Sequence, residues 1–145
     1  MTLDDYRLSR PESEADWDAY HRIRRTVLFE ARGRFGVYDP LHSDEFLTEN
    51  RPLLLFHLGG AIGTVRLDFP LGGIAYIRLL AIVPEKQKRG HGRVLLALLE
   101  RQALELGATV FEVNSANDSI GFYEKASFSL VHGGGQTSLL HKPLA

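Results

Sequence analysis

Residues 79–95, LLAIVPEKQKRGHGRVL, decide the fold of this chain. The first five residues are apolar, as in a strand covered on both faces, and Pro84 ends that strand. A basic turn follows with glycines at Gly90 and Gly92, and the chain then enters an amphipathic helix. The first turn of a helix has about four N–H groups without partners and carries partial positive charge. The strand end, the basic glycine turn and the helix start together predict a pyrophosphate site.

One of three phosphate-binding patterns fits this turn. A P-loop needs G-x-x-x-x-G-K-[ST], and the chain has no such string. A dinucleotide fingerprint would need a third glycine where Leu95 stands. The pattern Q/R-x-x-G-x-G/A is complete in Gln87, Gly90 and Gly92. The basic residues of this turn could also, taken alone, belong to a solvated surface loop. They are Lys86, Lys88, Arg89, His91 and Arg93.

Composition narrows the function classes. The chain has 145 residues, of which 44% are hydrophobic and 24% charged, as in a soluble globular domain. No run approaches the roughly 20 apolar residues of a membrane-spanning helix, and the start lacks an apolar signal segment. We therefore expect a cytoplasmic protein without a membrane partner. The absence of cysteine excludes disulfides, thiolate metal sites and a cysteine nucleophile, and we predict no metal site. A net charge of −1 argues against a nucleic-acid partner.

The remaining pattern predicts one domain over residues 1–145, without repeats or linkers. Antiparallel strands come first, then a strand–helix–strand unit, then a helix and a hairpin, which is a mixed α/β sheet. The pair Gly59-Gly60 predicts a tight hairpin turn in which both glycines take positive φ. The expected strands are 6–10, 53–58, 61–69, 74–83, 108–113, 127–132 and 136–142, and the expected helices are one from Pro11 to about Gly33, a short one near 44–47, 90–106 and 117–125.

Two segments resemble one known family. Residues 79–85 followed by 87–92 resemble the strand and pyrophosphate loop of the GNAT superfamily of acyl-CoA-dependent N-acyltransferases. Downstream, IGFYEKASF at 120–128 resembles that family's F-Y-E-K-L-G-F stretch, although Ser127 stands where the family has glycine. Weaker resemblance at 23–30 and 63–67 extends the match over most of the chain. The resemblance implies a single α/β (α+β) GNAT-like domain: a mixed, mostly antiparallel sheet of about seven strands, a central strand–helix–strand cofactor unit and about four helices.

The resemblance also implies acetyl-CoA as the acyl donor. The pantetheine arm would lie along the strand against backbone groups of Ile82 and Val83, and the loop N–H groups would hold the pyrophosphate. Many relatives carry an asparagine seven residues before the tyrosine, where this chain has Ala116; the adjacent Asn117 either reaches the cofactor or caps the short helix. The full set of expected cofactor-binding residues is Ala81, Ile82, Val83, Gln87, Lys88, Arg89, Gly90, His91, Gly92, Asn117 and Tyr123.

Two residues are expected to be catalytic. By resemblance, Tyr123 is the acid that protonates the departing thiolate; the alternative is a tyrosine that only packs beside Phe122. Glu112 is a candidate base if its side chain points into the gap where the two central parallel strands part, and otherwise it is a surface carboxylate. Arg78 occupies a position where some relatives would have a carboxylate. Further candidates for the base are His21, His57 and Asp44.

The resemblance implies an N-acetyltransferase that moves an acetyl group from acetyl-CoA to a primary amine by direct attack, with which the absence of cysteine agrees. The alternative is a non-catalytic acyl-CoA-binding regulatory module, which needs the glycine loop but not Tyr123. We expect acceptor contacts from the polar segment 30–50, whose mixed charges permit a small amine, an amino acid, a polyamine or a peptide amine. The charged residues of that segment that we expect at the acceptor are Arg32, Arg34, Asp39, Asp44 and Glu45. The apolar closing strand 136–142 suggests pairing with a second copy as a homodimer.

Overall fold

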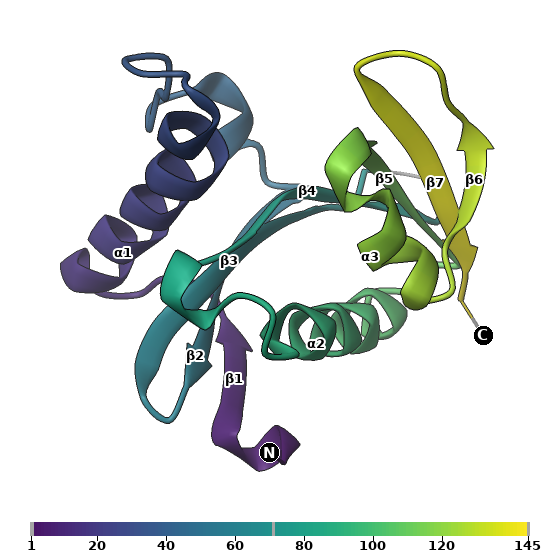
Figure 1. Cartoon of the computed structure of the whole chain (residues 1–145). Helices are drawn as coiled ribbons and strands as arrows, with labels where there is room; N and C mark the ends of the chain where they lie inside the picture. Colours follow the sequence, from purple (N-terminus) through teal and green to yellow (C-terminus); the bar gives the residue numbers. More distant parts are fainter. Residues whose placement is uncertain (1, 71, 145) are drawn as a thin grey trace.

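The computed structural model describes residues 2–70 and 72–144. Seven strands form one sheet in the order β1-β2-β3-β4-β5-β7-β6, in which only β4 and β5 run parallel. Helix α1 lies on one face of the sheet, and α2 and α3 lie on the other (Figure 1); we call these the α1 face and the α2 face. The bounds are β1 Tyr6–Ser9, α1 Glu14–Arg24, β2 Asn50–His57, β3 Gly60–Asp68, β4 Ile74–Ile82, α2 His91–Glu105, β5 Val110–Ala116, α3 Ile120–Lys125, β6 Ser129–His132 and β7 Thr137–Pro143.

The predicted mixed, mostly antiparallel sheet of seven strands is confirmed. The described residues contain three α-helices, whereas about four were expected. The short helix expected near 44–47 is a 3-10 turn at Ser43–Phe46. The helix expected from Pro11 to about Gly33 is α-helical only to Arg24 and continues as a π-helical turn at Arg25–Phe29 and a 3-10 turn at Glu30–Arg32. Gly33 ends this segment in the left-handed conformation at φ 77°, as a glycine after a helix commonly does.

The start of α1 is held by a capping box. The Ser13 hydroxyl accepts the N–H of Asp16 at 3.1 Å, and the Asp16 carboxylate accepts the N–H of Ser13 at 3.3 Å. From this start, α1 buries Tyr20 and Ile23 against the sheet, where they pack in one cluster with Leu54, Phe56 and Ala81. This cluster fixes α1 over β2, β3 and the end of β4.

The hairpin between β2 and β3 turns one residue earlier than the sequence predicted. Leu58 and Gly59 take positive φ, at 52° and 88°, while Gly60 already pairs with His57 as the first residue of β3. The expectation that Gly59 and Gly60 both take positive φ was therefore wrong. A two-residue turn closed by the His57–Gly60 pair places its two positive φ values at 58 and 59.

The α2 face carries the larger core. Helix α2 buries one apolar stripe, and the buried residues of β3, β4 and β5 that meet it belong to the same cluster. The stripe consists of Leu95, Leu96, Leu99 and Ala103, and the strand residues include Val65, Leu67, Ile77, Phe111 and Val113. Among the described residues, no helix is both long and apolar enough to cross a membrane.

Strands β4 and β5 pair only at their beginnings. Their ladder starts at Ile74–Val110 and ends at Ile77–Val113, after which β4 pairs only with β3 and β5 only with β7. A β-bulge bends β4 just beyond this point, with Leu79 at φ 55°. We call the place where the two parallel strands separate the split. It lies at their carboxyl ends, where ligands bind in many α/β sheets.

The closing strand β7 lies inside the sheet. It pairs with β5 along Thr137–Pro143 and with β6 at Leu139, Leu140 and His141. The predicted homodimer contact through this strand is therefore wrong, because the pairing groups of its central residues are already used. The edge on that side is β6, whose Leu130 and Val131 are exposed.

Candidate active site

The glycine loop presents the start of α2 without a side-chain cap. After β4 the chain makes a 3-10 turn at Pro84–Lys86, and Gly90 then precedes α2 at φ 88°. No side chain caps the first turn of α2, so its N–H groups remain available to a ligand. Lys88 takes φ 61°, a conformation that is uncommon for a residue with a side chain and that clusters at functional sites. The loop has the geometry of an anion site.

Gly92 marks a close approach between three elements. A Cβ atom at Gly92 would lie 3.0 and 3.2 Å from two ring atoms of Phe122 on α3 and 3.9 Å from Cγ1 of Ile82 on β4. The end of β4, the start of α2 and the helix α3 therefore meet beside the split. A larger residue at 92 would push against the Phe122 ring.

The backbone at the end of β4 has one open donor position. The N–H of Val83 donates to Ile62 O at 2.9 Å, and Val83 O accepts from the N–H of Lys86 at 2.9 Å. Because neighbouring residues of an antiparallel ladder alternate in direction, the N–H and C=O of Ile82 point away from β3, toward the split. The Ile82 carbonyl accepts the side chain of Gln87 at 2.9 Å. Of the expected pantetheine contacts at Ala81, Ile82 and Val83, the Ile82 N–H is the group best placed for a ligand.

The side chain of His91 points into the protein. It is 4% exposed, and its Nδ1 lies 2.7 Å from the Tyr6 hydroxyl, while the His57 ring lies 4.8 Å away between centroids. Burial lowers the pKa of His91, and the nearby His57, Lys86 and Arg89 lower it further. Of His91, only the backbone therefore faces a ligand at the glycine loop. Lys88 and Arg89 are exposed beside it.

Tyr123 packs in the core and still offers its hydroxyl. Its side chain is 6% exposed and makes edge contacts with Phe122 at 5.0 Å and Phe128 at 5.4 Å between ring centroids. Burial raises the pKa of Tyr123, so the phenol stays protonated and able to donate. Within the described residues, its hydroxyl makes no hydrogen bond and yet is not among the buried unpaired atoms. Ser127, in place of the family glycine, adopts the left-handed conformation at φ 74°.

Asn117 is engaged on the other side of the split. Its Nδ2 donates to Gly135 O at 3.1 Å, and its Oδ1 accepts from the Ser138 hydroxyl at 3.3 Å. It therefore ties the end of β5 to the β6–β7 connection and does not cap the short helix. The next residue, Asp118, lies 3.4 Å from Arg32, which brings the segment after α1 to the end of β5. The role of Asn117 at the cofactor stays a prediction.

Glu112 lies one residue before the split. It lies opposite Tyr76 on β4 and His141 on β7, at a position where β5 still pairs with both neighbouring strands. Its neighbours Phe111 and Val113 belong to the α2-face core, so alternation places Glu112 on the α1 face. Glu112 is thus half-buried on the sheet surface beside the split, and not inside the gap between the strands.

The other candidates for the base either contact another side chain of the protein or lie exposed at the surface. His21 Nδ1 is hydrogen-bonded to the Tyr38 hydroxyl. His57 stacks on Tyr6, with ring centroids 4.5 Å apart. Asp44 lies at the surface beside His42. Among the predicted candidates, Glu112 stands nearest to the split in the strand register.

A chain of ion pairs on the α1 face was not predicted from the sequence. Arg24 Nη2 lies 2.7 Å from Glu45 Oε1, and the same carboxylate lies 3.1 Å from Arg66 Nη1. Arg66 then forms two bonds with Asp68, at 2.7 and 2.8 Å, and Asp68 Oδ2 lies 3.5 Å from Arg78 Nε. We call these five residues the arginine–carboxylate chain. The available signal was the pair Arg66 and Asp68, two charges spaced by two on one face of an otherwise apolar strand.

Glu45 is the centre of this arrangement. Its side chain is 7% exposed, and it also accepts the Tyr20 hydroxyl at 3.3 Å. Burial by itself would raise the pKa of Glu45, but the hydrogen bonds and charges of Arg24 and Arg66 outweigh it and hold the pKa below its usual range. The carboxylate is therefore ionised and fully occupied, so Glu45 is a structural anchor of the segment 30–50.

The family model for the acetyltransferase (GNAT) family matches residues 13–128, which include the glycine loop, the split and Tyr123. The chain belongs to the GNAT family of acetyltransferases. A similar protein is the one named "Putative acetyltransferase BSU40680" from Bacillus subtilis (strain 168), with 29% identity over 121 residues that cover 80% of this chain and 78% of that protein.

Solved GNAT structures share the fold. An acyl-CoA N-acyltransferase from Pseudomonas aeruginosa superposes with a TM-score of 0.80 at 14% identity, covering 95% of this chain and 98% of the other. The PaiA N-acetyltransferase from Thermoplasma acidophilum, solved in complex with coenzyme A, superposes with a TM-score of 0.74 at 17% identity and covers 99% of both chains. At these identities the likeness concerns the fold, and the expected GNAT domain is confirmed.

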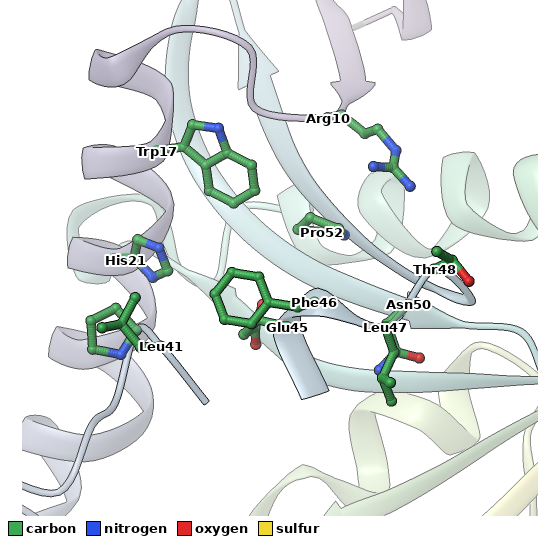
Figure 2. A pocket seen from close by; sticks show the side chains of 11 residues that line it. Arg10, Trp17, His21, Leu41, Glu45, Phe46, Leu47, Thr48, Asn50 and Pro52 are labelled. Atoms are coloured by element: carbon green, nitrogen blue, oxygen red, sulfur yellow. The ribbon is translucent and has the colours of Figure 1, made fainter. Parts of the chain in front are cut away.

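This GNAT domain also has a cavity on the α1 face. Its volume is about 640 Å³, and it opens between α1 and the start of β2. Figure 2 shows Trp17 and His21 projecting from α1 on one side, Phe46 between them and the sheet, and Arg10 and Pro52 on the opposite side. The lining residues are Arg10, Trp17, His21, Pro40, Leu41, Glu45, Phe46, Leu47, Thr48, Asn50 and Pro52. Seven of these eleven come from the segment that the sequence assigned to the acceptor.

Proposed function

We propose that this protein is an N-acetyltransferase that moves an acetyl group from acetyl-CoA to a primary amine by direct attack. The observation that carries the proposal is the uncapped start of α2, which lies beside the split close to Ile82 and to Phe122, the neighbour of Tyr123 on α3. Coenzyme A is the ligand of the similar T. acidophilum enzyme. Family membership supports acyl transfer in general.

In this proposal the cofactor is bound by the glycine loop and the end of β4, on one side of the split. The N–H groups of the glycine loop, residues 87–92, hold the pyrophosphate, with Lys88 and Arg89 adding positive charge at the surface. The Ile82 N–H binds the pantetheine arm as one strand would bind another. Tyr123 donates its proton to the departing thiolate, for which its raised pKa keeps it protonated. The chain has no cysteine that could carry the acetyl group as a thioester, which agrees with direct attack by the amine.

The amine enters from the α1 face. Glu112 does not point into the gap, but it is half-buried on that face beside the split, and from there it accepts the amine proton directly or through water. The segment 30–50 is anchored next to this face by the Glu45 ion pairs and by the contact of Arg32 with Asp118. The cavity in Figure 2 provides room for part of the acceptor.

The cofactor is tested by melting the protein with acetyl-CoA, with ATP and NAD as controls. A ligand that binds only the folded state at a hundredfold excess over Kd stabilises it by about 2.7 kcal/mol. We therefore expect a clear rise in Tm with acetyl-CoA and none with the controls. An equal rise with ATP, or no rise at all, would contradict the assignment of the glycine loop to acetyl-CoA.

Tyr123→Phe separates the enzyme from a non-catalytic acyl-CoA-binding module. The substitution keeps the ring that packs against Phe122 and Phe128 and removes only the hydroxyl. We expect kcat to fall by about 100-fold, within the usual contribution of a general acid, while the acetyl-CoA shift in Tm is unchanged. Release of free thiol with an amine panel measures the rate. Unaltered turnover in the variant would show that Tyr123 only packs, and no turnover in the wild type with any amine would favour the binding module.

A further inference from the structure

The arginine–carboxylate chain has one positive charge in excess. Its three guanidinium groups, from Arg24, Arg66 and Arg78, share two carboxylates, from Glu45 and Asp68. Buried or half-buried charges are usually paired, because their desolvation is costly. An unbalanced cation in such a chain therefore indicates either exposure to water or a missing anion.

The excess charge is accessible at Arg78. All three nitrogens of Arg66 are bonded to Glu45 or Asp68, and the Arg66 side chain is 8% exposed. Arg24 is bonded to Glu45 through Nη2, and its Nε and Nη1 lack hydrogen bonds but are buried, with the guanidinium over the Tyr20 ring at 4.7 Å, so Arg24 offers no nitrogen to a ligand from solvent. The Arg78 side chain is 36% exposed, and its Nε lies 3.5 Å from Asp68 Oδ2.

The Arg78 guanidinium is held in place by Tyr76, and its carboxylate partner Asp68 is shared with Arg66. It lies over the Tyr76 ring, 5.0 Å from the ring centroid, which fixes its direction. Its two terminal amino groups make no hydrogen bond within residues 2–70 and 72–144. A guanidinium fixed in this way presents a planar pair of donors, and a carboxylate is the group that fits such a pair.

The position of Arg78 separates it from the cofactor phosphates. It is the first residue of β4 beyond the last pair with β5, Ile77–Val113, so it stands at the split. Its partner Asp68 belongs to the ion-pair chain of the α1 face, whereas the glycine loop lies at the start of α2 on the opposite face. The β3 residues opposite Arg78 and Ile82 are Arg66 and Gly63, three positions apart, so the two residues of β4 lie roughly 10 Å apart along the sheet. An anion bound by Arg78 therefore belongs to the acceptor.

We propose that Arg78 binds a carboxylate of the acceptor, so that the acceptor is a small amine that also carries a carboxylate, such as an amino acid. This inference rests on the proposed N-acetyltransferase function. Glu112 lies on the neighbouring strand of the same face, two positions back from Arg78 in the register. The acceptor amine then faces Glu112 while its carboxylate faces Arg78. A polyamine would instead place its second positive charge against Arg78, which is unfavourable.

The test compares each proteinogenic amino acid with its own α-carboxamide, which keeps the side chain and removes the negative charge. Rates are compared at equal concentrations of free amine, because the amide has a lower amine pKa. We expect the preferred amino acid to exceed its amide by at least about 10-fold in kcat/KM, as for a hydrogen-bonded charge pair. Equal rates for acid and amide, or faster transfer to the amide, would overturn the inference.

Arg78→Gln should lower kcat/KM for the preferred amino acid by about 10- to 100-fold, mainly through KM, and leave the amide unchanged. Arg78→Lys keeps the charge and should recover part of the loss. Arg101→Gln is the matched control, since Arg101 is exposed on α2 at the opposite face. The melting temperature of each variant reports whether it folds. An equal loss for acid and amide in Arg78→Gln would show a structural role only.

A binding measurement keeps this inference distinct from the proposed function. Saturation-transfer NMR on the protein saturated with coenzyme A detects amino acids and amides without turnover. Preference for the acid that disappears in Arg78→Gln would support the inference even if no thiol were released. Binding without any preference would overturn it, even if transfer to other amines established the enzyme.

Discussion

Replacing Glu45 by glutamine is expected to destabilise the protein by about 3–5 kcal/mol, the usual cost of removing one partner from a buried ion pair. Glutamine keeps the shape of the side chain but leaves Arg24 and Arg66 without their shared negative charge at 2.7 and 3.1 Å. Unfolding in urea, followed by circular dichroism, measures the free energy of unfolding. The loss should appear as a lower midpoint with little change in the slope.

Glu30→Gln is the matched control for this result. Glu30 pairs with Arg25 at 3.8 Å, but both side chains are well exposed, so its loss should cost less than about 1 kcal/mol. If the two variants were equally stable, the pairs made by Glu45 would contribute no more than a surface pair. That outcome would contradict the structural role given to the arginine–carboxylate chain.

The effect of Glu45→Gln should also depend on pH. The pKa of Glu45 is lowered in the folded protein from its ordinary value of 4.5, so ionisation of this group favours folding. Its stabilisation is complete above that value and is lost as the pH falls through the lower, folded-state pKa. The difference in stability between wild type and variant should therefore be full at pH 7 and should narrow in acid.

Gly92→Val is expected to reduce the rise in Tm with acetyl-CoA to a small fraction of the wild-type rise. The added Cβ would already lie 3.0 Å from Phe122, and the two methyl groups would occupy the approach to the first turn of α2. At a ligand concentration that stabilises the wild type by about 2.7 kcal/mol, a hundredfold weaker Kd reduces that gain to about 0.4 kcal/mol. Thermal melting with and without acetyl-CoA measures both values.

Gly60→Val provides the comparison for Gly92→Val. Gly60 begins β3 outside the glycine loop, and a Cβ there would make only an ordinary contact at 3.8 Å with His57 O. We expect this variant to keep the full acetyl-CoA shift. If Gly92→Val kept it as well, the pyrophosphate would not lie against the start of α2.

The strand, loop and helix at residues 74–106 were predictable because their signals are local. An apolar run ended by Pro84, two glycines and a helical stripe of leucines need no partner to be recognised, and the structure places β4 and α2 within a residue of the expected bounds. The exact position of the hairpin turn was not predictable in this way. A shift of the turn by one residue places Leu58 at a positive φ in place of Gly60. Turn register depends on which pair closes the hairpin, and strand pairing sets that pair.

By itself, the sequence determined the fold class, the family and the position of the glycine loop, since each depends on residues adjacent in the chain. The tertiary structure decided the rest. It inserted the last strand between β5 and β6, turned the side chain of His91 toward Tyr6, and tied Asn117 to Gly135. It also joined Arg24, Glu45 and Arg78 into one charged chain. These contacts join residues far apart in the chain, and a side chain gives no local sign of which distant partner will neutralise its charge or accept its hydrogen bond.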